Sequence, residues 1–524
     1  MASSTIIADD FERITNELRQ EFRTGRTLSV AYRKEQLRKL HRFLDDNQKL
    51  IIETLKNDLR KPWFETVIVE VDFVLNEIRS TLANIDQYCQ KKCVAKSMTT
   101  LFDDTFVHHE PYGLVLIVGA WNYPVQIILA PLVGAIAAGN VAIIKPSELA
   151  PESSQLIAKL LPRYLDSRCY RVVTGDAEKS KRLLEYKFDY IFFTGSGTIG
   201  RAVHQAAARH LTPTTLELGG KSPIYLHDSL PSSAMKIACR RMIWGKMMNA
   251  GQTCIAPDYV LCSNKVRQQL QQHLIDVIEE FFGHDPQKTD DFGRIVNKRH
   301  FDRLIDLLNT CSGKIFYGGK IDANDRYISP TIIFDVSPDD PIMKEEIFGP
   351  IFPFVTIRTA DEAIQFINTR PKPLAIYLFA EDKIVRDRFI QETSSGALCV
   401  NDVVLHVSLD TLPFGGVGES GMGAYHGRYS FNTFSHQKAV LVRGYNGLLE
   451  IIGSRRYPPY NRTKLARLLR LLKKRQLPFD DIPYRLILTA IISFIFGLLV
   501  AYMLIELSSS SSSTLSSSCI IPNL

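Results

Sequence analysis

The sequence lacks the marks of a disulfide-bonded or metal-binding protein. Its nine cysteines are odd in number, scattered between positions 89 and 519, and include no Cys-x-x-Cys pair. They therefore predict neither a disulfide framework nor a zinc ribbon. Cys89 and Cys93 have the helical spacing of half a metal site, but no second His or Cys pair stands nearby, and we expect no metal. The N-terminus turns acidic within ten residues and has no apolar run, which excludes a signal peptide.

Excess charge of one sign is also missing from most of the chain. The net charge is +7 over 524 residues, and residues 453–485 alone hold ten Arg or Lys against two Asp. Because this short segment carries more positive charge than the whole chain, the body before it is close to neutral. A neutral body argues against nucleic-acid binding, and the basic segment predicts an anionic membrane surface as a partner.

A long hydrophobic run lies near the C-terminus. Residues 486–505 contain twenty residues without a charge, which is the length of a transmembrane helix. A buried core helix is the alternative. The preceding residues 462–476 form an amphipathic basic pattern that suits the surface of a cytoplasmic leaflet, although a solvated surface helix would have the same pattern. The basic flank places the body in the cytosol.

The body has the pattern of an α/β protein. Residues 10–95 show helical periodicity, and apolar strand-like runs then alternate with helices. The expected strands lie in 111–121, 141–147, 190–196, 222–228, 348–357 and 374–380. This alternation predicts a Rossmann-like, doubly wound parallel sheet. Its return after residue 222 predicts a second α/β lobe, with a cleft between the two.

A glycine motif suggests a dinucleotide. Gly195, Gly197 and Gly200 form G-x-G-x-x-G between a predicted strand and a helix, where free N–H groups favour a phosphate. The usual spacing would make Glu217 the ribose partner. We instead favour Lys145 and Glu148, which end an earlier strand; a surface ion pair is the alternative reading. A carboxylate there would repel a 2′-phosphate, so we expect NAD, with NADP used more weakly.

Cys254 follows the loop-forming residues Gly251, Gln252 and Thr253. Such a loop would present the thiol rather than bury it, which suits a nucleophile. A small buried core residue is the more common role of a free cysteine, and Cys169 and Cys239 stand in contexts of that kind.

Seven motifs in order resemble the aldehyde dehydrogenase superfamily, and in detail its class 3 branch. They are GAWNYP (119–124), KPSE (145–148), FTGS (193–196), LELGGKSP (216–223), GQTC (251–254), EEIFGP (345–350) and PFGGVGESGMGAYHG (413–427). The resemblance runs from about residue 10 to residue 445. The C-terminal apolar run makes the chain similar to the tail-anchored enzymes of that branch that act on fatty aldehydes.

The resemblance implies a role for each matching residue. Cys254 would be the nucleophile, Asn122 the oxyanion-hole amide and Glu217 the general base. Lys145 and Glu148 would hold the adenosine ribose. The remaining cofactor contacts would come from Gly195, Ser196, Gly197, Gly200, Glu346, Phe348 and Trp121.

These roles predict NAD-dependent oxidation of medium- to long-chain aliphatic aldehydes to carboxylic acids, through a cysteine thiohemiacetal and a hydrolysed thioester. A CoA-acylating dehydrogenase and a catalytically idle structural tether are the alternatives. The resemblance also implies a homodimer and favours the endoplasmic reticulum. The mitochondrial outer membrane and the peroxisome stay open as destinations.

The expected domain order follows from the same motifs. We expect an NAD-binding domain at 1–220 with a bridging β segment near 98–112, a catalytic domain at 221–412, a bridging and oligomerisation segment at 413–452, a basic juxtamembrane segment at 453–485, a transmembrane anchor at 486–505 and a Ser-rich tail at 506–524.

Overall fold

The computed structural model describes residues 10–97, 99–101, 103–445, 447–472 and 484–512. The chain divides into two compact units. One comprises Met1–Lys92 and Val107–Ala439, and the other comprises Cys93–Phe106 and Val440–Leu524.

The first unit begins with helices, as the periodicity of residues 10–95 predicts. They are α1 (Asp10–Arg23), α2 (Val30–Leu59), α3 (Trp63–Glu65), a π-helix (Thr66–Asp72) and α4 (Phe73–Tyr88). The sequence pattern did not predict the π-helical stretch, in which Thr66, Glu70 and Val71 are buried. π-Helical turns often occur at functional sites.

A six-stranded sheet in the order β17-β7-β6-β3-β4-β5 forms the first lobe. Its strands are β3 (Leu114–Val118), β4 (Val141–Lys145), β5 (Tyr170–Val172), β6 (Tyr190–Thr194), β7 (Thr214–Glu217) and β17 (Gly421–Met422). The first five are parallel, which confirms the expected sheet, and β17 joins it antiparallel.

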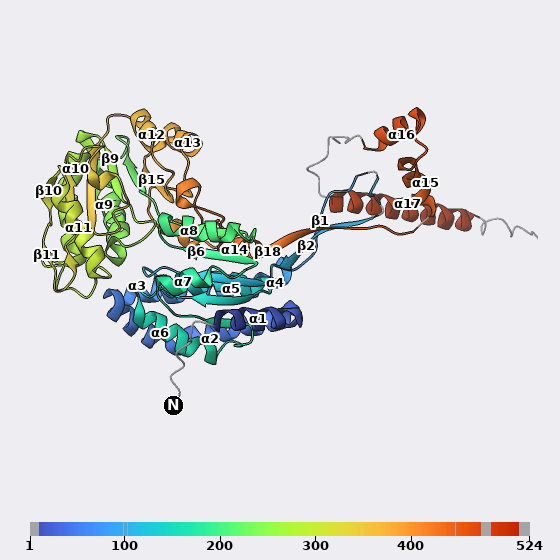
Figure 1. Cartoon of the computed structure of the whole chain (residues 1–524). Coiled ribbons are helices and arrows are strands. Elements are labelled where there is room, and N and C mark those ends of the chain that lie inside the picture. Colours follow the sequence, from blue (N-terminus) through green and yellow to red (C-terminus); the bar gives the residue numbers. More distant parts are fainter. Residues whose placement is uncertain (1–9, 98, 102, 446, 473–483, 513–524) are drawn as a thin grey trace, which may run out of the picture. The chain divides into compact units, whose positions relative to one another are not determined.

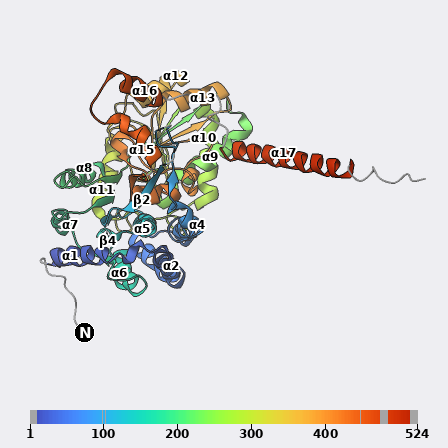
Figure 2. The ribbon, with the colours of Figure 1, turned by 90° about the vertical axis from the view of Figure 1, so that its right-hand side faces the viewer.

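Helices cover both faces of this sheet. They include α5 (Gln126–Ala138), α6 (Pro151–Leu160), α7 (Ala177–Leu183), α8 (Gly197–Ala208) and α14 (Gly427–Thr433). Figures 1 and 2 show α1, α2 and α6 together below the sheet. All residues of α5 are buried, since this apolar helix packs against α2, α4 and α14.

The second lobe is a seven-stranded sheet in the order β10-β13-β14-β9-β8-β15-β16. Its strands are β8 (Pro223–Leu226), β9 (Tyr259–Cys262), β10 (Lys314–Tyr317), β13 (Thr331–Phe334), β14 (Ile351–Thr356), β15 (Ala375–Phe379) and β16 (Ala397–Val400). All but β10 are parallel. The sheet is flanked by α9 (Ser232–Met247), α10 (Asn264–Phe282), α11 (Lys298–Thr310), α12 (Ala360–Asn368) and α13 (Lys383–Glu392).

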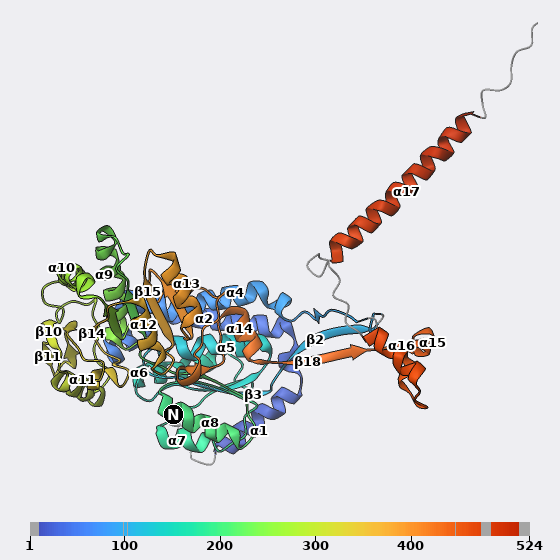
Figure 3. The ribbon, with the colours of Figure 1, turned by 90° about the horizontal axis from the view of Figure 1, so that it is seen from above.

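A three-stranded sheet of β1 (Lys92–Cys93), β2 (Asp104–Pro111) and β18 (Ser435–Val442) lies where the chain passes from one unit to the other. The second unit also holds α15 (Gly447–Gly453), α16 (Arg462–Leu472) and α17 (Tyr484–Ser512), a continuous helix in Figure 3. Within this unit Arg443 and Asp103 form an ion pair of 2.7 Å.

The predicted membrane segments are described only in part. Residues 473–483 and 513–524 lie outside the described residues, as do the side chains of residues 486–488 and 491 in the predicted anchor. In the part of the chain that the structure describes, no helix combines the length and the apolar character needed to cross a membrane.

Candidate active site

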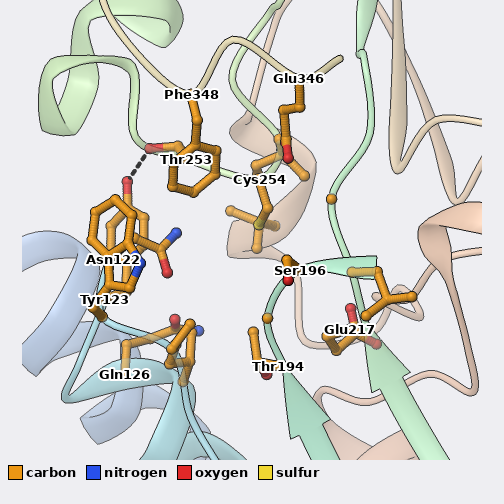
Figure 4. Close-up of a pocket in the computed structure, with 18 of the residues that line it drawn as sticks. Asn122, Tyr123, Gln126, Thr194, Ser196, Glu217, Thr253, Cys254, Glu346 and Phe348 are labelled. Carbon is orange, nitrogen blue, oxygen red and sulfur yellow. Dashed lines mark hydrogen bonds between the residues drawn. The ribbon is translucent and has the colours of Figure 1, made fainter. Parts of the chain in front are cut away.

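A cavity of about 440 Å³ in the first unit brings the predicted catalytic residues together. Cys254, Asn122 and Glu217 all line it, and Figure 4 shows Cys254 between the other two in that view. Each comes from a different element: Asn122 from the turn after β3, Glu217 from the end of β7 and Cys254 from the loop before β9. The carboxyl ends of parallel strands meet at one edge, where such folds bind ligands.

The loop that precedes Cys254 is a left-handed turn. Asn249, Ala250 and Gly251 have φ angles of 53°, 52° and 75°, a run of positive φ that is costly for residues with a Cβ. A Cβ at Gly251 would lie 2.2 Å from the carbonyl oxygen of Gly349, so the loop approaches the 345–350 segment as only glycine permits.

The Gln252 side chain secures this turn. Its amide donates to the carbonyl oxygens of Asn249 at 3.0 Å and Arg294 at 2.9 Å, and its oxygen accepts from the Val296 N–H at 3.0 Å. The fully satisfied glutamine explains how a strained turn persists in a buried position. The result is a half-buried Cys254 that faces the cavity.

Burial raises the pKa of the Cys254 thiol to about 12, and the carboxylates of Glu346 and Glu217 add to this shift. The resting thiol is therefore protonated at neutral pH. A nucleophile in this setting needs a base or a bound ligand to release its proton.

Asn122 is 5% exposed, in the turn between β3 and α5. Its Nδ2 donates to the Gln252 carbonyl oxygen at 3.1 Å, so its amide reaches the loop that carries Cys254. The neighbouring Tyr123 hydroxyl lies 2.6 Å from Oγ1 of Thr253. Two adjacent residues of this turn therefore contact the nucleophile loop.

Glu217 is 3% exposed at the end of β7. Neither of its carboxylate oxygens has a hydrogen-bond partner among the described residues, and burial raises its pKa well above the usual value. A buried carboxyl with a raised pKa and free oxygens has the properties of a general base or acid.

The glycine motif lies beside Glu217, because the Gly195 N–H donates to the Glu217 carbonyl oxygen at 3.0 Å. Gly195, Ser196 and Gly197 line it, and Ser196 caps α8 by accepting from the Ile199 N–H at 3.5 Å. Gly200 instead allows close packing, because a Cβ there would lie 2.6 Å from Leu218. The α8 N-terminus, with the small residues before it, fits a phosphate group.

The remaining predicted cofactor residues come from two loops: Glu346 and Phe348 lie between β13 and β14, and Trp121 lies in the turn after β3. Glu346, Phe348 and Trp121 line the cavity, and the rings of Trp121 and Phe348 contact edge to face at 5.4 Å. Burial raises the pKa of Glu346 to about 8, with Asp258 adding to the shift. A Cβ at Gly219 would lie 2.2 Å from the Glu346 carboxylate, so this glycine makes room for it.

Lys145 and Glu148 lie apart from this cavity and do not line it. Lys145 ends β4, the strand beside β3, and its Nζ pairs with Glu148 at 2.8 Å. The lysine side chain is 4% exposed and the glutamate 39%. The lysine of the pair is therefore buried, and the glutamate is accessible to solvent.

The sequence did not reveal most of the apolar lining. It comes from Val69, Phe73, Ile127, Met248, Ile255, Val404, Val407 and Phe414. These residues belong to a π-helix, two α-helices, two 3-10 helices and loops, with no shared motif. Only the apolar character of the positions around 125–135 could have suggested part of it.

The described residues contain no group of three or more His, Cys, Asp or Glu side chains placed to hold a metal ion. Cys89 contacts Nη1 of Arg33 at 3.5 Å, and Cys93 is exposed.

A profile described as the aldehyde dehydrogenase family matches residues 3–440. "Aldehyde dehydrogenase family 3 member B1" of Mus musculus is 46% identical over 467 residues, covering 89% of this chain and 98% of that protein. "Aldehyde dehydrogenase family 3 member A2" of Rattus norvegicus is 47% identical over 455 residues, with 87% and 93% covered. "Aldehyde dehydrogenase, dimeric NADP-preferring" of Mus musculus is 46% identical, with 85% and 97% covered.

A solved structure agrees with these relatives. "Substrate bound state of Staphylococcus Aureus AldH" superimposes with a TM-score of 0.84 at 41% identity, covering 88% of this chain and 99% of that one. The family profile, the class 3 relatives and the shared fold confirm the resemblance drawn from the seven motifs. The chain belongs to the aldehyde dehydrogenase family, whose members oxidise aldehydes with NAD or NADP.

Proposed function

We propose that the chain oxidises medium- to long-chain aliphatic aldehydes to carboxylic acids with NAD. One observation carries the proposal: Cys254, Asn122 and Glu217 line a single cavity whose other walls are largely apolar. We assign residues 1–220 to the cofactor-binding domain, 221–412 to the catalytic domain and 413–452 to a bridging segment.

In the first half-reaction, the Cys254 thiol loses its proton to solvent, and the thiolate adds to the aldehyde carbon to form a thiohemiacetal. The Asn122 amide and the Cys254 N–H stabilise the new oxyanion, a contribution of about 2.7–4 kcal/mol per donor in comparable sites. NAD, when bound, would supply the acceptor for the hydride that leaves the same carbon, and a thioester would remain on Cys254.

In the second half-reaction, Glu217 takes a proton from the water that attacks the thioester. Its raised pKa suits it to this task, because a base works best when its pKa lies near the working pH. The acid is released and the thiol is regenerated. We favour this hydrolysis over transfer to CoA, and over an idle tether, because a buried carboxyl without a protein partner suits water activation.

The cofactor would lie along the carboxyl edge of the first sheet. The α8 N-terminus with Ser196 would hold the pyrophosphate, and Glu346 and Phe348 the nicotinamide side. Lys145 and Glu148 would bind the adenosine ribose, and the half-exposed Glu148 carboxylate would repel a 2′-phosphate. We therefore propose a preference for NAD.

The C-terminal region would attach the enzyme to a membrane. The basic helix α16 exposes more than half of Leu465, Leu469 and Leu472, which suits a helix on an anionic lipid surface. Residues 486–505, a charge-free stretch of α17, would anchor the chain with its body in the cytosol. In line with the class 3 resemblance, the membrane would be that of the endoplasmic reticulum, and the enzyme would form a homodimer.

The decisive test measures NADH formation by its absorbance, with hexadecanal and NAD as substrates and without CoA. The Cys254→Ala variant should lose activity completely, because Cys254 is the one cysteine among the described residues that line the cavity. Cys311→Ala, which changes a partly buried cysteine outside the cavity, is the matched control and should keep wild-type activity. Activity that survives in Cys254→Ala would refute the site.

The membrane part of the proposal is tested separately. A chain that ends at residue 452 should lose more turnover with vesicle-bound hexadecanal than with hexanal, because only the long aldehyde partitions into the bilayer. Equal losses with the two substrates would count against a role of the tail in substrate delivery and leave the chemistry intact.

A further inference from the structure

A completely buried ion pair lies next to the Asn122 turn. Lys61 follows α2, and Glu70 belongs to the π-helix; Nζ and Oε1 are 2.5 Å apart, and both side chains are 0% exposed. Neither residue lines the cavity. The pair therefore cannot touch a substrate, and its role must be exerted through its neighbours.

The side chains of the pair bind the short segment from Asn122 to Gln126. Nζ of Lys61 donates to the Asn122 carbonyl oxygen at 2.9 Å and lies 3.9 Å from the ring centroid of Tyr123. Oε2 of Glu70 accepts from the N–H of Val125 at 3.1 Å and of Gln126 at 2.9 Å. The pair thus holds a carbonyl, a ring and two N–H groups of one turn.

The opposite side of this turn faces the nucleophile loop. Nδ2 of Asn249 donates to the Asn122 carbonyl oxygen at 2.9 Å, the same oxygen that Lys61 binds. The Asn122 amide and the Tyr123 hydroxyl contact the residues just before Cys254. The turn is therefore fixed from behind by the ion pair and in front by the loop.

Stability alone is a poor explanation for such a pair. Removing two charges from water is costly, and a buried ion pair is often no more stabilising than apolar residues of similar size. A charge-assisted hydrogen bond, however, is short and directional. These properties suit a pair that holds a catalytic amide in one place.

We propose that Lys61 and Glu70 are positioning residues that hold the Asn122 amide in register with Cys254. The inference rests on the proposed role of Asn122 in oxyanion stabilisation. Because small displacements of a catalytic group can cost about 100-fold in rate, disruption of the pair should lower kcat and leave the KM for NAD unchanged.

Two variants test this. Glu70→Gln keeps an oxygen for the Val125 and Gln126 N–H groups but places an amide against Nζ of Lys61; we expect kcat with hexanal to fall about tenfold. The Lys61→Met, Glu70→Gln double variant removes both charges while the Met fills the lysine stem, and we expect a fall of about 30- to 100-fold. The matched control is Asp382→Asn. It changes a carboxylate outside the cavity that accepts hydrogen bonds from N–H groups in the first turn of α13.

A double-mutant cycle separates positioning from general damage. In an Asn122→Ala background the double variant should cause less than a twofold further loss, since there is no amide left to hold. Equal losses in both backgrounds, or wild-type kcat in a folded Glu70→Gln enzyme, would overturn the inference and leave the proposed function standing. Wild-type kcat in Asn122→Ala alone would overturn the role of Asn122 and this inference together.

A kinetic isotope effect gives a second reading. With hexanal deuterated at C1, a poorly stabilised oxyanion slows the half-reaction that breaks the C–H bond. The isotope effect on kcat should therefore rise in Glu70→Gln and stay at the wild-type value in Asp382→Asn. An unchanged isotope effect in a slower Glu70→Gln enzyme would contradict the positioning role.

Discussion

The cavity lining has two parts, which we call its polar side and its apolar side after the chemistry of their residues. On the polar side, Glu217 is buried without a hydrogen-bond partner among the described residues, and the Cys254 thiol has a pKa raised to about 12. The apolar side includes Phe73, Val404 and Phe414, which offer only apolar surface. The polar side holds buried groups in energetically costly states, whereas the apolar side can contact the alkyl chain of a substrate without loss of a hydrogen bond.

This difference predicts two scales of mutational effect. An unpaired buried polar group is tolerated when it acts on the reacting atoms, so its loss should change the rate by orders of magnitude. An apolar wall discriminates by size, where one methylene is worth about 1–3 kcal/mol. The polar side should therefore determine kcat, and the apolar side should determine which aldehyde is used.

The largest effect should follow Glu217→Gln. The amide cannot take a proton from water, so hydrolysis of the thioester should slow by about 10²–10⁴-fold while the first half-reaction continues. A rapid burst of one NADH per site should precede a slow steady state, and mass spectrometry should detect the acyl group on Cys254. A steady-state loss without a burst would place Glu217 in the first half-reaction instead.

The next effect concerns the turn that presents Cys254. Gly251→Ala would add a Cβ 2.2 Å from a backbone oxygen at a φ of 75°. The clash is with backbone and cannot be relieved by a side-chain rotation, so we expect a loss of about 2–3 kcal/mol in unfolding free energy and roughly 100-fold in kcat. Thermal unfolding and steady-state rates measure both.

Gly283→Ala is the control for Gly251→Ala. Gly283 also has a φ of 70°, but nothing lies within 4 Å of the added Cβ. It should therefore cost only the backbone strain and leave kcat unchanged. If both variants lost activity equally, the close approach of the loop to Gly349 would have no part in catalysis.

The pH dependence should sharpen the polar side of the comparison. The raised thiol pKa means that Cys254 is mostly protonated at neutral pH. As long as the pH lies below this pKa, each increase of one pH unit raises the thiolate fraction about tenfold. The burst rate of the Glu217→Gln enzyme should therefore increase between pH 7 and pH 9. A flat burst rate over this range would mean that binding of aldehyde or NAD has already lowered the thiol pKa.

The apolar side is tested by enlarging it. Phe414→Ala removes a buried ring from the cavity wall, so the loss of contact should fall on the alkyl chain and leave the reacting atoms in place. We expect kcat/KM for hexanal to fall about 10-fold relative to that for a branched aldehyde of larger width, with kcat for either within a few-fold of wild type. A collapse of kcat with both aldehydes would show that the ring belongs to the polar side.

The sequence predicted the polar side far better than the apolar one. Cys254, Glu217 and Asn122 each stand in a short motif at the end of a strand or before one, where local pattern and function coincide. Val404 and Phe414 stand in loops whose path depends on contacts across the lobe. No local pattern signals such positions, because burial there is decided by residues far away in the sequence.

The same reasoning explains why the ion pair behind Asn122 was missed. Lys61 and Glu70 read as ordinary polar residues of a helical segment, and that segment was expected to be α-helical throughout. The π-helix places Glu70 at the start of α5, more than fifty residues away. The β17 strand beside β7 was missed for a similar reason: two residues of a glycine-rich stretch carry no strand pattern.

The smallest effect should come from Glu148, which lies outside the cavity altogether. Its side chain is 39% exposed, so solvent screens its repulsion of a 2′-phosphate. Glu148→Gln should improve kcat/KM for NADP by about fivefold and leave kcat with saturating NAD unchanged, since the pair with Lys145 does not line the cavity that holds the thiol. Glu152→Gln, an exposed carboxylate in the first turn of α6, is the matched control. If both variants changed NADP use equally, general surface charge rather than a ribose contact would account for the preference, and the assignment of Lys145 and Glu148 would fail while the reaction at Cys254 stood unaffected.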